Sequence, residues 1–135
     1  MSEVEQQIVA PAPGDVVLVV EDDAFLRRML TEKLHKEGLN VFEATNGTEA
    51  HESLNKQTPN IILLDLMMPG TDGFQLLREI KTDAKTKDIP VMVLSNLGEK
   101  EHIERAMSLG AVDYMIKAHF VLDEIVSKIK SILNK

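Results

Sequence analysis

Five short apolar runs alternate with amphipathic stretches along this chain, and no other feature constrains its fold as strongly. Three of the runs are continuous and rich in β-branched residues, which is typical of strands buried on both faces of a parallel sheet. In chain order the runs are VVLVV (16–20), NVFEAT (40–45), NIILLD (60–65), PVMVLS (90–95) and AVDYMI (111–116). The alternation predicts five strands.

The stretches between the runs carry apolar residues at helical spacing. The clear stripes are Leu26, Met29, Leu30 and Leu34; Phe74, Leu77 and Ile80; Ile103, Ala106 and Met107; and Leu122, Ile125, Val126, Ile129, Ile132 and Leu133. Residues 48–56 predict a weaker helix, with only Ala50 and Leu54 facing inward, and Thr71 or Asp72 is expected to cap the helix that follows. Strands and helices therefore alternate as (βα)₅.

Parallel strands joined by right-handed crossover helices leave few topologies for such a chain. We expect an α/β fold, a doubly wound (βα)₅ flavodoxin-like sandwich with a parallel five-stranded sheet of order 2-1-3-4-5. Residues 1–14 end in Pro11, Pro13 and Gly14 and predict a flexible N-terminal tail. Residues 15–135 predict a single domain, because a chain of 135 residues with 44% hydrophobic composition supports one core.

The composition excludes some classes of function and disfavours others. The chain has no cysteine, so disulfides, thiolate zinc sites and thiol catalysis are excluded. A formal net charge of -7 disfavours binding to nucleic acid or to a membrane surface, because nucleic-acid affinity comes mainly from Lys and Arg. No apolar run approaches the roughly 20 residues that span a bilayer, and the start MSEVEQQIVAPAPG lacks the features of a secretory signal. We therefore expect a cytoplasmic protein.

Polar residues stand at the ends of four of the five predicted strands. They are Glu21, Asp22 and Asp23 after the first, Asp65 after the third, Ser95 at the end of the fourth and Lys117 after the fifth. Ligands of doubly wound folds bind at the carboxyl ends of the strands, near the switch in strand order. We therefore expect these side chains to converge on one site.

Acids that converge in this way favour a particular chemistry. Carboxylates packed together resist ionising unless a cation joins them, and hard oxygen ligands suit Mg²⁺, or Mn²⁺ in its place. A carboxylate can also act as a nucleophile and form an aspartyl phosphate. Phosphoryl transfer requires mainly positioning and charge neutralisation, which a metal ion and a lysine supply.

Four segments resemble the receiver domain of response regulators in two-component signalling, in particular the stand-alone receivers of the chemotaxis type. The segments are VVEDDAFLRRML, IILLDLMMPGTDGFQLL, PVMVLSN and GAVDYMIKAHF, and the resemblance extends from about residue 16 to residue 133. It implies that Asp65 is the phospho-acceptor. It also implies that Asp22 binds the metal directly, that Glu21 acts through water, and that Met67 contributes its backbone carbonyl. Asp23 is not expected to touch the metal.

The same resemblance implies a conformational switch. Ser95 matches the hydroxyl residue that moves toward the phosphoryl group, and Lys117 matches the lysine that pairs with the acceptor and the phosphoryl oxygens. Tyr114 matches the aromatic residue that changes rotamer on activation. These movements would alter the surface of the fourth helix, fifth strand and fifth helix, where a downstream protein target is expected to bind.

Three features depart from the family pattern. Ala118 replaces the usual proline of a cis peptide, so we expect a trans bond after Lys117 and a lysine loop that runs differently. Asn96 stands where alanine or glycine is usual, and its amide can cover the acceptor or hydrogen-bond the phosphate. Met67 and Leu97 occupy the positions that gate the hydrolytic water, and because both are bulky and apolar they predict slow loss of the phosphate.

The function implied by the resemblance is a phosphorylation-dependent signalling switch. The phosphoryl donor would be a sensor histidine kinase or a phosphotransfer protein. Such a protein assists its own phosphorylation and dephosphorylation but is not a turnover enzyme. Because no output domain follows the last helix, we expect it to bind another protein or to pass the phosphate on, without direct contact with nucleic acid or membrane.

Three alternatives stay open at the level of sequence. A receiver-like module that binds partners without being phosphorylated fits the changes at Ala118 and Asn96, although the retained acids argue against it. An aspartate-nucleophile phosphohydrolase needs an acid/base two residues after its nucleophile, where this chain has Met67. A flavodoxin-type electron carrier is compatible with the fold alone, but the acids after the first strand would repel a flavin phosphate.

Overall fold

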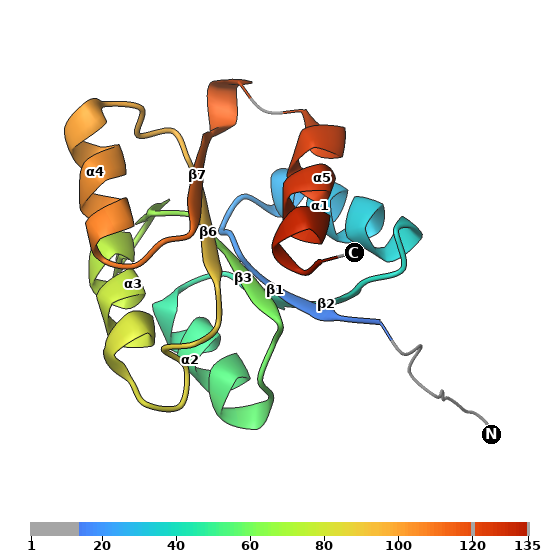
Figure 1. The fold of residues 1–135 in the computed structure, drawn as a ribbon, viewed down its shortest axis with the longest axis horizontal. Coiled ribbons are helices and arrows are strands. Elements are labelled where there is room, and N and C mark those ends of the chain that lie inside the picture. Colours follow the sequence, from blue (N-terminus) through green and yellow to red (C-terminus); the bar gives the residue numbers. More distant parts are fainter. Residues whose placement is uncertain (1–13, 120, 135) are drawn as a thin grey trace.

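The main sheet has the strand order expected from the sequence. The computed structural model describes residues 14–119 and 121–134, and in these ranges five parallel strands pair in the order β2-β1-β3-β6-β7 (Figure 1). They are β1 (Val16–Val20), β2 (Asn40–Ala44), β3 (Ile61–Leu64), β6 (Val91–Ser95) and β7 (Asp113–Ile116). With the short strands β4 and β5 set aside, this order is 2-1-3-4-5, and the doubly wound prediction is confirmed. The tail predicted at residues 1–14 lies outside the described residues, except for Gly14.

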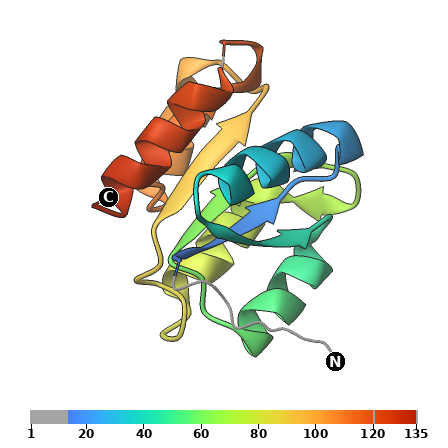
Figure 2. The same cartoon turned by 90° about the vertical axis from the view of Figure 1, so that its right-hand side faces the viewer.

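Helices cover both faces of the sheet. The described residues form five α-helices: α1 (Ala24–Lys36), α2 (Gly47–Lys56), α3 (Gly73–Thr82), α4 (Lys100–Ser108) and α5 (Leu122–Ile132). Helices α1 and α5 lie on one face, and α2, α3 and α4 lie on the other (Figures 1 and 2). A short 3-10 helix, η1 (Lys117–His119), follows β7. None of these helices is both long enough and apolar enough to cross a membrane.

Each face of the sheet has its own apolar core. Successive residues of a strand point to opposite faces, so Leu18 and Val20 of β1 pack in the core of α2, α3 and α4, while Val17 and Val19 pack in the core of α1 and α5. A strand placed between two apolar layers needs apolar side chains at every position. The continuous apolar runs of the sequence follow from this requirement.

The helices agree with their predicted stripes at most positions. Ala50 of α2 is buried and Leu54 packs against the same core, as predicted. Asp72, rather than Thr71, caps α3. Its Oδ1 accepts hydrogen bonds from the backbone N–H groups of Phe74 and Gln75, at 3.0 and 3.2 Å. The inward position predicted for Met107 is wrong, because 42% of this residue is exposed. Helix α4 packs through the small, buried Ala106, and the adjacent position points about 100° away around the helix.

The loop after β3 contains a hairpin that the sequence pattern did not predict. Its strands, β4 (Met67–Met68) and β5 (Thr71–Asp72), pair in antiparallel fashion. Gly70 lies at the turn with a φ of 72°, in the left-handed region that favours glycine. Gly73 begins α3 directly against the backbone of Leu66, where an added Cβ would lie 2.3 Å from the Leu66 Cα. The hairpin and α3 are thereby held close to the carboxyl end of β3.

Candidate functional site

The structure brings the predicted polar residues together at the carboxyl end of the sheet. Glu21 follows β1, Asp65 follows β3, Ser95 ends β6 and Lys117 follows β7. Glu21, Asp65 and Ser95 are the buried polar or charged residues of the described part of the chain, with exposed fractions of 2%, 3% and 0%. Buried polar groups require partners, and the partners of these three lie within the site itself.

Three carboxylates form an acid cluster at this end of the sheet. Each of Glu21, Asp22 and Asp65 offers an oxygen, and the three oxygens lie within 4.8 Å of one another. Asp23 is not part of this cluster, as expected. It caps α1 instead, and its Oδ1 accepts hydrogen bonds from the N–H groups of Phe25 and Leu26 at 2.9 and 3.1 Å.

Lys117 joins two members of the acid cluster. Its Nζ lies 2.9 Å from the Oδ2 of Asp65 and 2.9 Å from the Oε1 of Glu21. The described residues contain no cis peptide bond, so the bond between Lys117 and Ala118 is trans, as expected. With this trans bond and with η1 beginning at Lys117, the Lys117 Nζ donates a hydrogen bond to Asp65.

Burial and pairing have opposite effects on these groups. Burial raises the pKa of the Glu21 carboxyl above its ordinary value, and hydrogen bonds from Lys117 and from the backbone of Asp23 offset part of the rise. Burial alone would lower the pKa of the Lys117 ammonium, but its hydrogen bonds to Glu21 and Asp65 outweigh burial, and the pKa is raised. Lys117 is therefore a cation at every pH at which the domain is expected to work.

The second oxygen of Asp65 is held by the loop that follows β3. The backbone N–H of Met67 donates to the Oδ1 of Asp65 at 3.0 Å. One oxygen of Asp65 thus faces the Lys117 ammonium and the other faces the loop, and the two contacts together fix the rotation of the carboxylate. The metal contact predicted for the Met67 carbonyl stays a prediction.

Ser95 and Tyr114 are linked through the loop after β6. The Ser95 Oγ accepts a hydrogen bond from the Leu97 N–H at 3.2 Å, and the Tyr114 hydroxyl donates to the Leu97 carbonyl. Burial raises the pKa of the Tyr114 phenol, and a hydrogen bond with Ser95 offsets part of that rise. The two residues predicted to switch therefore contact one short segment. Asn96, within that segment, is exposed.

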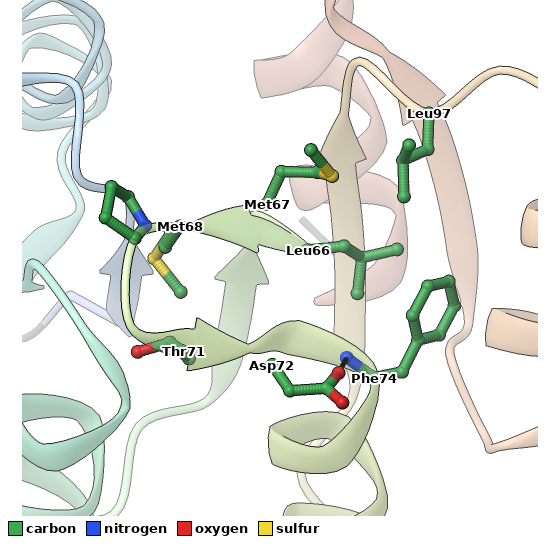
Figure 3. A pocket seen from close by; sticks show the side chains of 8 residues that line it. Leu66, Met67, Met68, Thr71, Asp72, Phe74 and Leu97 are labelled. Carbon is green, nitrogen blue, oxygen red and sulfur yellow. Dashed lines mark hydrogen bonds between the residues drawn. The ribbon is translucent and has the colours of Figure 1, made fainter.

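An apolar pocket of about 470 Å³ lies next to the loop that follows Asp65. Met67, 57% exposed, enters it from β4, and Leu97 enters it from the loop after β6 (Figure 3). The remaining lining residues are Leu66, Met68, Pro69, Thr71, Asp72 and Phe74. The two residues predicted to gate the hydrolytic water thus share one pocket, although their effect on hydrolysis stays a prediction.

One contact of the site was absent from the sequence prediction. Arg27 of α1 donates from its Nη1 to the backbone carbonyls of Glu21 and Asp22, at 2.9 and 3.3 Å. The available signal was its position four residues after the helix cap Asp23, which places it one turn along α1 and near the preceding loop. Every residue has a backbone carbonyl, so the sequence does not show which carbonyls an arginine will contact. The position of Arg27 alone therefore did not identify the contact.

The acid cluster has the chemistry of a site for a hard divalent cation. Its donors are carboxylate oxygens from two separate loops, the ligand type that Mg²⁺ and Mn²⁺ prefer. With all three acids ionised, the single ammonium of Lys117 leaves an excess of negative charge. Asp22 is partly exposed, so the cluster is open to solvent on one side. The residues present fit a bound divalent cation.

The fold and this set of residues are those of the receiver domains of two-component signalling. Residues 17–130 match the family described as "Response regulator receiver domain". The chain therefore belongs to that family.

Individual relatives agree with this assignment. The phosphate regulon transcriptional regulatory protein PhoB of Pseudomonas aeruginosa is 37% identical over 122 residues, which cover 90% of this chain and 53% of that protein. The chain thus spans about half the length of this curated relative. A two-component response regulator from Clostridium difficile has a similar structure, with a TM-score of 0.83, 25% identity and coverage of 90% and 97% of the two chains. The Mn²⁺-bound form of response regulator Rcp1 gives a TM-score of 0.76 and 30% identity, with coverage of 87% and 92%.

Proposed function

We propose that this protein is a signalling switch in which Asp65 accepts a phosphoryl group from a sensor histidine kinase or a phosphotransfer protein. The observation that carries the proposal is the position of Asp65. It is buried at the carboxyl end of the central strand β3, belongs to a cluster of three carboxylates and lies 2.9 Å from the Lys117 ammonium. An acid in this setting has both a counter-charge and a place for a metal ion.

The proposed reaction is an in-line transfer between two protein side chains. An oxygen of Asp65 forms a bond to phosphorus as the bond from phosphorus to the donor's histidine nitrogen breaks, and the product is an acyl phosphate. Lys117 faces Asp65 Oδ2 and supplies positive charge for the phosphoryl oxygens. The hydroxyl of Ser95 donates a hydrogen bond to one of those oxygens. The protein assists this transfer and the later hydrolysis but does not turn over a substrate.

A divalent cation would be held by Glu21, Asp22 and Asp65, with the carbonyl of Met67 as a further ligand. Bound Mg²⁺ or Mn²⁺ would neutralise the charge of the phosphoryl oxygens. The Mn²⁺-bound form of Rcp1, a protein 30% identical to this chain, supports the choice of cation. We assign the whole process to the cytoplasm, where histidine kinases hold their phosphorylated histidine.

The signal would leave the site through the segment that joins Ser95 to Tyr114. Movement of Ser95 toward a phosphoryl oxygen would break its hydrogen bond with the Leu97 N–H and shift the carbonyl that holds Tyr114. Tyr114 lies on β7, between α4 and α5. We propose that the α4–β7–α5 face, the predicted surface of fourth helix, fifth strand and fifth helix, binds the downstream protein target.

The alternative of a module that is never phosphorylated finds no specific support. Its main argument was the loss of proline at position 118, yet Lys117 contacts both Asp65 and Glu21. A phosphohydrolase is also not favoured, because the residue two positions after Asp65 is a methionine whose side chain lines an apolar pocket.

The test is the intact mass of the protein after incubation with acetyl phosphate or phosphoramidate and Mg²⁺. We expect the mass of one phosphoryl group on the wild type and on Asp88→Asn, a control at an exposed acid, but not on Asp65→Asn. Beryllofluoride with Mg²⁺ should bind the same two labelled proteins. An unlabelled wild type, or a label that persists in Asp65→Asn, would contradict the proposal.

A further inference from the structure

Helix α1 holds an arginine against the backbone of the loop that carries two of the three acids. The Nη1 of Arg27 lies 2.9 Å from the carbonyl oxygen of Glu21 and 3.3 Å from that of Asp22. The arginine side chain is only 17% exposed. It does not contact the carboxylates through these bonds, so it acts on the path of the backbone rather than on the ligand oxygens.

The guanidinium is itself held on its other side by the edge strand β2. Its Nε donates to Glu43 Oε1 at 3.0 Å, and the second oxygen of Glu43 accepts from the Thr31 hydroxyl at 3.0 Å. An ion pair with a partner as exposed as Glu43 contributes little stability by itself. Its effect is geometric, because a planar guanidinium held at Nε directs its remaining N–H groups along fixed lines.

The loop between β1 and α1 is therefore fastened at two independent places. At its end, Asp23 caps α1, and the Asp23 N–H donates to Glu21 Oε2 at 3.0 Å. At its start, Arg27 binds the carbonyls of Glu21 and Asp22. Metal ligands need positions accurate to a fraction of an ångström, and the groups that orient them typically change affinity 10–100-fold when removed.

We infer that Arg27 is a positioning residue for the divalent cation: it sets the backbone of Glu21 and Asp22 so that their carboxylates meet Asp65 at one point. The inference rests on the proposed function, since it assumes that the acid cluster binds a metal ion. It also assigns Glu43 and Thr31, on β2 and α1, a part in the same arrangement.

Charge and geometry predict opposite effects of removing this arginine. A guanidinium near the cluster repels a cation, so loss of its charge alone would tighten metal binding. Loss of a fixed backbone would weaken it. We expect Arg27→Ala to weaken Mn²⁺ binding about tenfold, at the lower end of the usual range for residues that orient ligands. Arg27→Lys keeps the repulsive charge but loses the planar fork that holds the two carbonyls, so it should also bind Mn²⁺ more weakly than the wild type.

The experiment measures Mn²⁺ affinity by electron paramagnetic resonance of the free ion, alongside urea unfolding in EDTA. The matched control is Arg28→Ala, which removes an exposed neighbouring arginine with no hydrogen bond or ion pair to the described residues; it should bind Mn²⁺ like the wild type. Because unfolding in EDTA reports only the fold, weakened Mn²⁺ binding with an unchanged unfolding midpoint supports a positioning role. If Arg27→Ala fails to fold, Glu43→Ala releases the guanidinium instead and should weaken binding by a smaller factor.

The outcomes separate the inference from the proposal on which it rests. A wild type that does not bind Mn²⁺ overturns the metal site, and the role of Arg27 with it. A wild type that binds, together with an Arg27→Ala variant that binds equally or more tightly, overturns only the positioning role. Equal weakening in Arg27→Ala and Arg28→Ala overturns it as well, because the effect would then not depend on the hydrogen bonds that Arg27 makes to the carbonyls of Glu21 and Asp22.

Discussion

An apolar pocket adjoins the loop that follows Asp65. Met67 and Leu97 line the same pocket, and neither side chain can donate a hydrogen bond to water. Hydrolysis of an acyl phosphate needs a water molecule in line with the bond to Asp65. Two apolar side chains at this position would obstruct that water and leave it unoriented. We therefore expect a long-lived phosphorylated state.

Polar substitutions at Met67 and Leu97 should shorten the lifetime of the phosphorylated state. Met67→Asn and Leu97→Lys each remove apolar bulk and add a group that binds water, and we expect phosphate loss to accelerate about tenfold, equivalent to ~1.4 kcal/mol in the barrier. The measurement is the decay of the phosphorylated mass after removal of the donor. Met107→Asn is the control, since Met107 is also an exposed methionine but lies on α4. Unchanged decay in both site variants would count against gating by these side chains.

Helices α1 and α5 are joined by charged pairs along their common surface. The Nζ of Lys33 on α1 lies 2.8 Å from the Oδ1 of Asp123 on α5, and the Nζ of Lys130 on α5 contacts the Oε1 of Glu37 at the end of α1. The hydrogen bond from Lys130 is the largest of the effects that hold the pKa of Glu37 below its ordinary value. A lowered pKa means that the folded state favours the ionised acid. Folding therefore gains stability from this group above the ordinary pKa and loses it as pH falls through the lowered value.

Glu37→Gln should reveal this dependence on pH. We expect the variant to have a slightly lower urea midpoint than the wild type at neutral pH, because exposed pairs contribute little. The difference between the two urea midpoints should stay constant down to pH 4.5, the ordinary pKa of glutamate, and disappear below it. Glu32→Gln, at an exposed glutamate of the same helix, should show no such gap. A gap for Glu37→Gln that widens in acid would contradict this assignment.

The helices and the strands of the main sheet could be predicted from the sequence because the residues that each of them buries recur at a regular spacing. Strand order followed from continuous apolar runs such as 16–20 and from the handedness of crossovers. The β4–β5 hairpin escaped prediction because strands of two residues carry no periodicity. Met107 was misplaced because Ala106 is the buried residue of α4 and the next position along the helix turns away from the core.

The site could be predicted in large part because its chemistry lies at strand ends. Glu21, Asp65, Ser95 and Lys117 meet where the ends of parallel strands must meet. Arg27 was missed because it binds backbone carbonyls, which every residue has. The contact of Lys117 with Asp65 was implied by the family resemblance, but the path of the chain after β7, through η1 and Ala118, could not be derived from the sequence.

Charge balance at the end of the sheet connects the site to the stability of the whole domain. Glu21 and Asp65 are buried with the ammonium of Lys117 between them. Removing one partner from a buried charged set leaves the others uncompensated, which is strongly destabilising. A bound divalent cation contacts the same acids and would restore the balance.

We expect Lys117→Ala to lower the free energy of unfolding by about 3 kcal/mol in EDTA. Saturating Mg²⁺ should recover much of this loss, because a ligand at 100 times its dissociation constant stabilises by about 2.7 kcal/mol. Urea unfolding with and without Mg²⁺ measures both effects. Lys128→Ala, which removes a partly exposed pair with Asp113, should show only a small loss and no recovery by Mg²⁺. A metal-free Lys117→Ala as stable as the wild type would refute this view of the site.

The hydrogen bond between the Tyr114 hydroxyl and the Leu97 carbonyl has an optical consequence. The chain contains one tyrosine and no tryptophan, so its near-ultraviolet emission comes from Tyr114. Burial raises the pKa of that phenol, which therefore emits as the neutral form at neutral pH. In the proposed switch the surroundings of this ring change, so we expect the emission of the unlabelled protein to change as the phosphoryl group arrives, and a fluorimeter would follow it in real time.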